Sequence, residues 1–281
     1  MRLIDVRHLG RERVIGCWEL DGVLIDPGPT TAMENLIEAL NGEEPRALLL
    51  THIHLDHAGA AGSLVRRWPE LPVYVHERGA RHLADPTKLL DSAELLYGDQ
   101  MERLWGEVAP VPEANLHPLS GGEEVLGFRV AYTPGHASHH VSYLHPPSGR
   151  AFVGDVAAVR IPPSDFVLPP TPPPDIDLEL WEDSIERILD WEPESLGITH
   201  FGQVDDPEAH LELVRERLRE HAQLARELTA EQFERRLRER LSARADAETA
   251  EAAMQAAPPE QQWLGLDRYW TKRAEGAAEP R

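Results

Sequence analysis

The feature that most constrains this chain is the segment THIHLDHAG at residues 51–59, which directly follows the apolar run LLL at residues 48–50. A short apolar run that ends in polar residues is typical of a buried strand leading into a functional loop. Residues two apart in an extended segment point the same way, so His52 and His54 can converge on one ion. Imidazole ligands suit zinc, iron or manganese, and the segment therefore predicts a metal site.

Further ligands are expected where other strands end. Asp56 and His57 follow the first two histidines and are placed to reach a second ion. His136 comes after a strand-like run and a Pro-Gly turn, Asp155 ends the run FVGD, and His200 ends the run LGITH. The combined set holds five histidines and two carboxylates, enough for two ions with a position open to water. An open site of this kind indicates catalysis, whereas a structural site would be closed.

Composition narrows the class of protein. The 281 residues suit one large core, or one domain with an appendage, and the net charge of −21 argues against nucleic-acid binding. The single cysteine, Cys17, excludes an internal disulfide and a zinc site of the finger type, which needs several thiolates. No apolar run approaches the roughly 18 residues of a membrane span, and the first residues do not resemble a signal peptide. We therefore expect a cytoplasmic protein that binds a small molecule and no membrane.

The order of apolar patterns predicts the fold class. Short apolar runs precede the helical spacing at residues 31–40, and mostly helical spacing returns at 77–107. Strand-like runs resume from Leu116, with a hairpin around residues 146–149, and a helix is expected at 177–191. The order of strands followed by helices thus occurs twice along the chain. This repetition suggests two similar halves, packed sheet against sheet with helices outside.

Two segments lie outside this scheme. Residues 161–177 hold seven prolines and cannot form a central strand or a helix interior, so they form either a stiff connector or a wall of the active-site cleft. Beyond residue 204 the chain becomes helical, with a capping box at Thr229, a helix at 247–257 and a short one at 267–273. We divide the chain into a catalytic domain, residues 1–205, and a helical C-terminal extension, residues 206–281. The extension offers a possible homodimer surface.

The motifs THIHLDHAG, TPGH, VGD and THFG, in this order, resemble those of the metallo-β-lactamase superfamily over roughly residues 1–205. The resemblance implies an α+β fold, a four-layer αββα sandwich, with the site at one edge between the two sheets. It implies a first metal held by His52, His54 and His136, a second held by Asp56, His57 and His200, and Asp155 as the bridge between them.

This ligand set implies hydrolysis. Two cations about 3.5–4 Å apart lower the pKa of a bridging water, so that hydroxide can attack an ester, a thioester, a lactone or a similar bond near neutral pH. Asp56 is the candidate catalytic residue for proton transfer. Two divalent ions are expected, with zinc as the first choice and iron or manganese as alternatives.

Several positions depart from the family pattern. The third motif reads HASHH, so that Ser138 and His139 replace Pro and Gly. We expect His140 to support a ligand and His139 to face solvent. Ala158 stands where the dinuclear lactonases of this fold carry a tyrosine, which disfavours a lactonase of that type.

Other activities of the fold stay open. Glyoxalase II-like thioesterases share the seven ligands, but no residue of the tail matches their glutathione-binding residues. The main alternative is a mononuclear iron oxidoreductase of the persulfide dioxygenase type, and a non-catalytic metal-binding module is another. The number of metal ions per chain distinguishes the oxidoreductase from a dinuclear hydrolase. Turnover of an activated ester distinguishes the non-catalytic module from an enzyme. The walls that select the substrate are expected from residues 85–110, the proline-rich segment and the tail.

Overall fold

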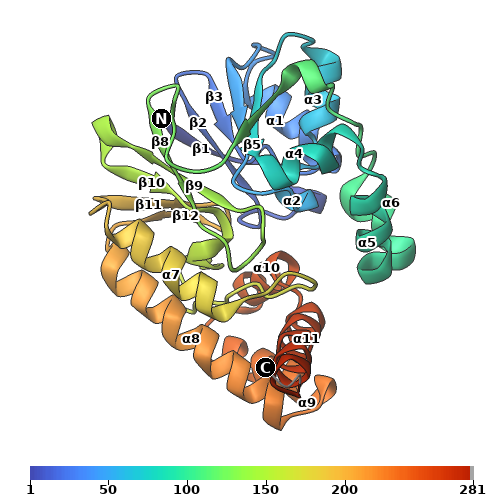
Figure 1. Cartoon of the computed structure of the whole chain (residues 1–281), viewed down its shortest axis with the longest axis vertical. Helices are drawn as coiled ribbons and strands as arrows, with labels where there is room; N and C mark the ends of the chain where they lie inside the picture. The colour runs from blue at the N-terminus through green and yellow to red at the C-terminus, as the bar shows by residue number, and fades with distance from the viewer. Residues whose placement is uncertain (279–281) are drawn as a thin grey trace.

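The computed structural model describes residues 1–278. Figure 1 shows two β-sheets lying face to face, with helices on the outer face of each sheet. The predicted α+β sandwich is therefore confirmed. The C-terminal helices form a further group beside the second sheet, at the lower end of the molecule in Figure 1.

The first sheet comprises the first half of the chain, with its six strands in sequence order. The first three strands pair antiparallel, and the last four run parallel to one another. Its strands are β1 (Arg2–Asp5), β2 (Gly16–Leu20), β3 (Val23–Ile25), β4 (Ala47–Leu49), β5 (Val73–His76) and β6 (Leu116–Leu119).

The second sheet has the order β12-β11-β10-β9-β8-β7. Only the pair β10 and β11 is parallel. Its strands are β7 (Glu124–Val125), β8 (Phe128–Tyr132), β9 (Val141–His145), β10 (Arg150–Phe152), β11 (Ser195–Ile198) and β12 (Gly202–Val204). The predicted hairpin around residues 146–149 joins β9 to β10.

The helices complete the layers. One group covers the first sheet, where α4 packs on β5 and β6, and α7 packs on β8 of the second sheet and on α8. The helices are α1 (Met33–Ala39), α2 (Leu55–Ala58), α3 (Ala61–Arg67), α4 (Glu77–Ala84), α5 (Thr87–Tyr97), α6 (Met101–Trp105), α7 (Leu178–Leu189), α8 (Pro207–Glu227), α9 (Ala230–Ser242), α10 (Ala247–Ala256) and α11 (Pro259–Ala278).

Large apolar side chains fill the space between the sheets. Trp18 of the first sheet lies edge-on to Phe152 of the second, with ring centroids 5.6 Å apart, and Phe128 and Tyr143 extend this layer. Burying each such side chain contributes roughly 1.5–3 kcal/mol. Gly197 of β11 is required here because an added Cβ would lie 2.7 Å from Phe152.

Strand direction explains why the polar loops meet at one edge. β3 and β4 run parallel, so the segments that follow them emerge on the same side. β8 and β10 both pair antiparallel with β9, and β11 runs parallel to β10, so these three strands also end together. The residues that follow five different strands therefore converge between the two sheets.

The tail differs from prediction in one element. The capping box at Thr229 forms as expected, with Gln232 as its partner, and starts α9. The predicted short helix at 267–273 is wrong in length, because α11 spans 20 residues from Pro259. Proline is favoured at a first helical position. Gly265 stays within the helix because an added Cβ would lie 2.0 Å from the carbonyl oxygen of Thr171 in the proline-rich segment.

The tail shares its core with the sandwich. Leu211 and Val214 of α8 and Leu266 of α11 belong to the same buried cluster as Trp181 of α7. The division of the chain at residue 205 stays a prediction. Within residues 1–278, no helix has both the length and the apolar character needed to cross a membrane.

Candidate metal centre

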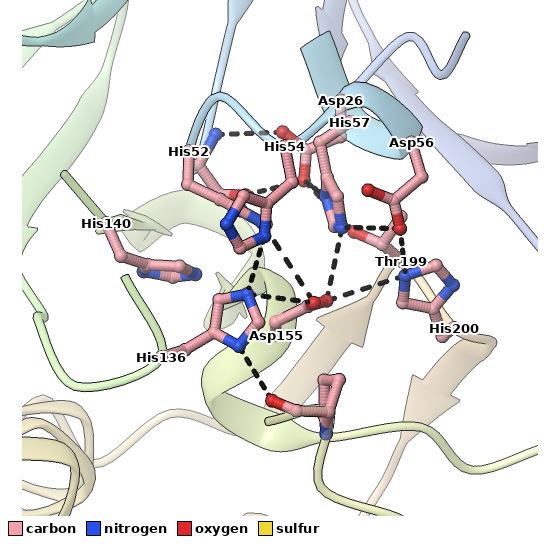
Figure 2. Close-up of polar contacts among 12 residues, drawn as sticks. Asp26, His52, His54, Asp56, His57, His136, His140, Asp155, Thr199 and His200 are labelled. Atoms are coloured by element: carbon pink, nitrogen blue, oxygen red, sulfur yellow. Dashed lines mark hydrogen bonds and ion pairs between the residues drawn. The ribbon is translucent and has the colours of Figure 1, made fainter. Parts of the chain in front are cut away.

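The structure brings all seven candidate ligands to the edge where the strands end (Figure 2). Their ligand atoms form two groups, and within each group the atoms lie within 4.8 Å of one another. The first group consists of His52, His54, His136 and Asp155, and the second consists of Asp56, His57 and His200.

Asp155 lies between the two groups. Its Oδ2 atom is 3.3 Å from His136 Nε2 and 4.0 Å from His52 Nε2, on the side of the first group. Its Oδ1 atom is 3.2 Å from His57 Nε2 and 3.5 Å from His200 Nε2, on the side of the second group. One carboxylate therefore faces both groups with different oxygens, an arrangement that allows it to be a ligand of two ions.

The second group closes around Asp56. Its Oδ2 atom lies 3.4 Å from His200 Nε2 and 3.7 Å from His57 Nε2. Asp56 and His57 lie in α2, a single helical turn that begins after His54. This turn changes the direction of the chain, so that His54 faces the first group while the next two polar residues face the second.

A buried aspartate outside the predicted set organises the centre. Asp26, which follows β3, accepts hydrogen bonds through Oδ2 from His57 Nδ1 at 2.8 Å and from Thr199 Oγ1 at 3.0 Å. It also accepts from the Thr51 hydroxyl at 2.7 Å and, through Oδ1, from the Thr51 backbone N–H at 2.8 Å. Asp26 therefore orients His57 and joins the segments that follow β3, β4 and β11.

The other histidines are oriented in the same way. His136 Nδ1 donates to the Pro170 carbonyl at 2.9 Å, and His200 Nδ1 donates to the Val14 carbonyl at 2.6 Å. The Thr51 hydroxyl donates to Asp26, so its oxygen accepts from His52 Nδ1 at 3.0 Å. Partners of this kind fix which ring nitrogen is free to bind a metal.

The free nitrogens provide the test of whether a metal fits. The Nε2 atoms of His52, His57 and His200 are buried and make no hydrogen bond within residues 1–278. Buried polar atoms almost always have a partner, and exceptions require an explanation such as a bound ion. Three unpartnered nitrogens that point toward two carboxylates are the donor set of a metal centre, so the residues fit bound divalent ions.

Electrostatics favour the protonation states that a metal requires in the first group of ligands and oppose them at His57 and His200. At these two rings burial is outweighed by the carboxylates of Asp155 and Asp56, which raise the pKa of each ring. Burial lowers the pKa of His52 well below 6.5 and that of His54 to about 4, so both rings are neutral. Burial raises the pKa of Asp155, but His57, His136 and His200 outweigh it and hold that pKa well below its usual range. Neutral imidazole and ionised carboxylate are the forms that bind metal ions.

Two histidines of the third motif lie outside both groups. His140 is buried, and its Nδ1 lies 3.0 Å from the Thr133 hydroxyl. His139 was expected to face solvent, and this is wrong. It is half-buried, lines the cavity beside the centre, and has its ring centroid 5.7 Å from that of His54. The motif carries His139 inward because α4 packs on it, with an added Cβ at Gly79 lying 3.6 Å from the His139 Cβ.

Comparison with known proteins agrees with this geometry. The sequence profile described as "Metallo-beta-lactamase superfamily" matches residues 19–200, which include every candidate ligand. The chain belongs to the metallo-β-lactamase superfamily. It is 30% identical over 197 residues to the "Metallo-beta-lactamase fold-containing protein ST1585" of Sulfurisphaera tokodaii, covering 67% of this chain and 71% of that protein.

Solved structures of the superfamily superpose on this chain. The structure of ST1585 has a TM-score of 0.66 at 27% identity, covering 77% of this chain and 85% of that one. The metallo-beta-lactamase family protein TTHA1429 of Thermus thermophilus superposes with a TM-score of 0.64, and the match covers 94% of this chain and 89% of TTHA1429. At 23% identity, the likeness to TTHA1429 shows the fold alone.

Among functionally named relatives, a hydroxyacylglutathione hydrolase of Legionella pneumophila is 31% identical over 144 residues. The match covers 49% of this chain and only 44% of that enzyme. These relatives place the chain in a superfamily of metallo-hydrolases.

Proposed function

We propose that the protein is a dinuclear metal-dependent hydrolase that cleaves an ester, a thioester, a lactone or a similar bond. In this proposal, Asp155 would help to hold both of two divalent ions, with zinc as the first choice and iron or manganese as alternatives. The observation that carries the proposal is that each oxygen of Asp155 faces a different group of ligand atoms. The first ion would be held by His52, His54 and His136, and the second by Asp56, His57 and His200.

Bound divalent ions would supply an acidic water and positive charge beside the oxygen that gains negative charge. The side chains of the protein have separate tasks. The carbonyls of Pro170 and Val14 and the carboxylate of Asp26 hold the Nδ1 protons, so that the opposite Nε2 atoms carry no proton; those of His57 and His200 have no hydrogen-bond partner in the described residues, and that of His136 lies 2.9 Å from His54 Nδ1. Asp56 lines the cavity beside the centre, where its carboxylate can accept a proton from the attacking water.

The alternative of a mononuclear iron oxidoreductase uses fewer ligands. In this chain the second group is retained, and His57 is held in place by Asp26. This arrangement supports two ions over one.

Turnover of a panel of esters, thioesters, lactones and phosphodiesters tests the proposal. We expect Asp56→Asn to lower kcat by about 10²-fold or more, the usual contribution of a positioned proton acceptor. Asp91→Asn, an exposed position on α5 outside the cavity, is the matched control and should retain full activity. Failure to hydrolyse any member of the panel, together with one iron per chain, would overturn the proposal in favour of the oxidoreductase.

A further inference from the structure

A cavity of about 900 Å³ lies beside the metal centre. His54, Asp56 and Asp155 of the centre form part of its lining. Its remaining walls come mainly from α4 to α6, from the proline-rich segment and from residues 254–262 of the tail. All of these except α4, which precedes residues 85–110, are regions expected from the sequence. The two halves of this cavity differ in chemistry, and the difference indicates what kind of molecule it accepts.

One half is cationic. Arg78 and Arg81 of α4 and Lys88 of α5 line it, in a chain whose net charge is −21. The ion pairs formed within residues 1–278 do not include these three side chains. The Arg78 Cζ atom lies 5.7 Å from the centroid of the Tyr132 ring, and no carboxylate in the described part of the chain forms an ion pair with this guanidinium.

Two carboxylates also face this cavity, apart from those of the centre. Asp175 of the proline-rich segment accepts a hydrogen bond from the Ser138 hydroxyl at 2.5 Å, and Glu260 lies on α11. Arg103 of α6 adds a further cation to the lining. Away from the metal centre, the lining therefore has four cations against two carboxylates, an excess of positive charge that attracts anions to this part of the cavity.

The other half is apolar. Leu89, Ala93, Leu96 and Tyr97 recur at helical spacing along α5 and line the cavity, and the Trp105 ring lies 5.1 Å from that of Tyr97. Ala93 and Trp105 share a buried cluster with Leu55, the residue between His54 and Asp56. Met254, Ala257 and Pro258 of the tail also line the cavity. The apolar half therefore begins directly at the metal-binding loop.

α5 gives the scale of the arrangement. Lys88 and Tyr97 lie at opposite ends of the lining face, nine residues apart, which is about 14 Å along a helix axis. A molecule that spans this distance would place one end among cations and the other among apolar side chains. The tail contributes Glu260 and no cation to the lining, so the anionic end is expected at α4 and α5.

We propose that the substrate is an amphiphilic anion: an acyl ester or thioester whose acyl chain lies against α5 and α6 and whose leaving part carries a negative charge bound by Arg78, Arg81 and Lys88. This inference rests on the proposed function. Hydrolysis would form a C–O bond from water and break the bond to the leaving part, releasing a carboxylate, the anionic alcohol or thiol and a proton.

Matched probes test the inference. S-octanoyl thioglycolate carries the charge, and S-octanoyl thioglycolamide is its neutral counterpart of nearly the same shape. We expect kcat/KM to be about tenfold higher for the anion, and Arg81→Gln and Lys88→Gln each to reduce this preference about threefold, as for a partly exposed ion pair. Raising the salt concentration should weaken the preference. Arg235→Gln, an exposed position on α9, is the charge-matched control and should leave it unchanged.

Binding of the uncleavable thioethers octylthioacetate and octylthioacetamide, measured by calorimetry, separates the two proposals. Turnover of both thioesters with equal kcat/KM would leave the hydrolase standing and overturn the anionic substrate. A preference that survives both glutamine variants would mean that the carboxylate binds the metals, and would overturn the assignment to α4 and α5. Tighter binding of octylthioacetate that both glutamine variants lose, without any turnover, would support the cationic wall and refute the hydrolase.

Discussion

Asp26→Asn is the substitution that most sharply tests how the metal centre is built. It replaces one oxygen of a fully buried carboxylate by an amide nitrogen and leaves the size of the side chain almost unchanged. The carboxylate accepts four hydrogen bonds, three of them at Oδ2. An asparagine has only one accepting oxygen, so at least one of the two sides must lose its hydrogen bonds.

The magnitude follows from the two possible orientations of the amide. If its oxygen replaces Oδ2, its NH2 group faces the Thr51 backbone N–H, and two buried donors oppose each other. If its NH2 group replaces Oδ2, His57 must accept through Nδ1, and its proton moves to the Nε2 atom that faces Asp155. Either orientation also removes the negative charge that contacts the buried His57 ring, and loss of one partner of a buried ion pair costs about 3–5 kcal/mol of unfolding free energy.

Metal affinity reports on the second orientation of the amide, in which the Nε2 atom of His57 carries the proton and cannot bind a metal. Outer partners of metal-binding histidines typically contribute about 10- to 100-fold to affinity, so we expect the second ion to be weakened by this factor. Urea denaturation of the metal-free protein measures the unfolding free energy, and competition with a chromophoric chelator measures the affinity.

Asp21→Asn is the matched control for this substitution. Asp21 has a φ of 50° and Asp26 a φ of 53°, so both aspartates occupy the left-handed region, where asparagine is tolerated. Asp21 is exposed, and its replacement should change stability by no more than about 0.5 kcal/mol. If Asp26→Asn behaved like Asp21→Asn in both assays, the organising role of Asp26 would be refuted.

Three further predictions concern the tail. Burial lowers the pKa of His221 in α8 to about 4, so the unfolded chain takes up a proton first as the pH falls below 6.5. This difference in proton uptake lowers the unfolding free energy by about 2 kcal/mol at pH 5 relative to pH 8. His221→Leu should remove this part of the acid sensitivity, as measured by denaturation curves at both pH values. An unchanged dependence of stability on pH would contradict the prediction. Gly265→Ala should lower stability by about 1–3 kcal/mol because its Cβ meets the Thr171 carbonyl, and proteolysis should then cut the proline-rich segment faster. Thr229→Ala should cost about 1 kcal/mol by removing the capping box, and a thermal midpoint equal to that of the unchanged protein would argue against it.

Much of the candidate centre could be predicted because one rule places its residues. His52, His136, Asp155 and His200 all stand just after an apolar run, and the parallel directions of the strands bring such positions together. Asp26 obeys the same rule after the run VLI. It was missed because the Pro-Gly that follows it reads as a turn, and turns are rich in aspartate for local reasons.

The cavity could not be predicted in the same way. Its walls depend on contacts between distant parts of the chain, such as the hydrogen bond of 3.3 Å from the Tyr97 hydroxyl to Gln261, 164 residues away. Helical spacing shows that one face of α5 is apolar, but not which other helix lies opposite. The inward position of His139 depends on close packing at Gly79, and Gly265 lies within α11 against the Thr171 carbonyl; local patterns carry no signal of either contact.

The number of metal ions per chain tests the central claim most directly. Elemental analysis of protein purified without added metal should find two divalent ions per chain, and Asp155→Ala should lower this number because the residue faces both groups of ligand atoms. A single ion per chain, unchanged when either His57 or His200 is replaced by alanine, would contradict the dinuclear account.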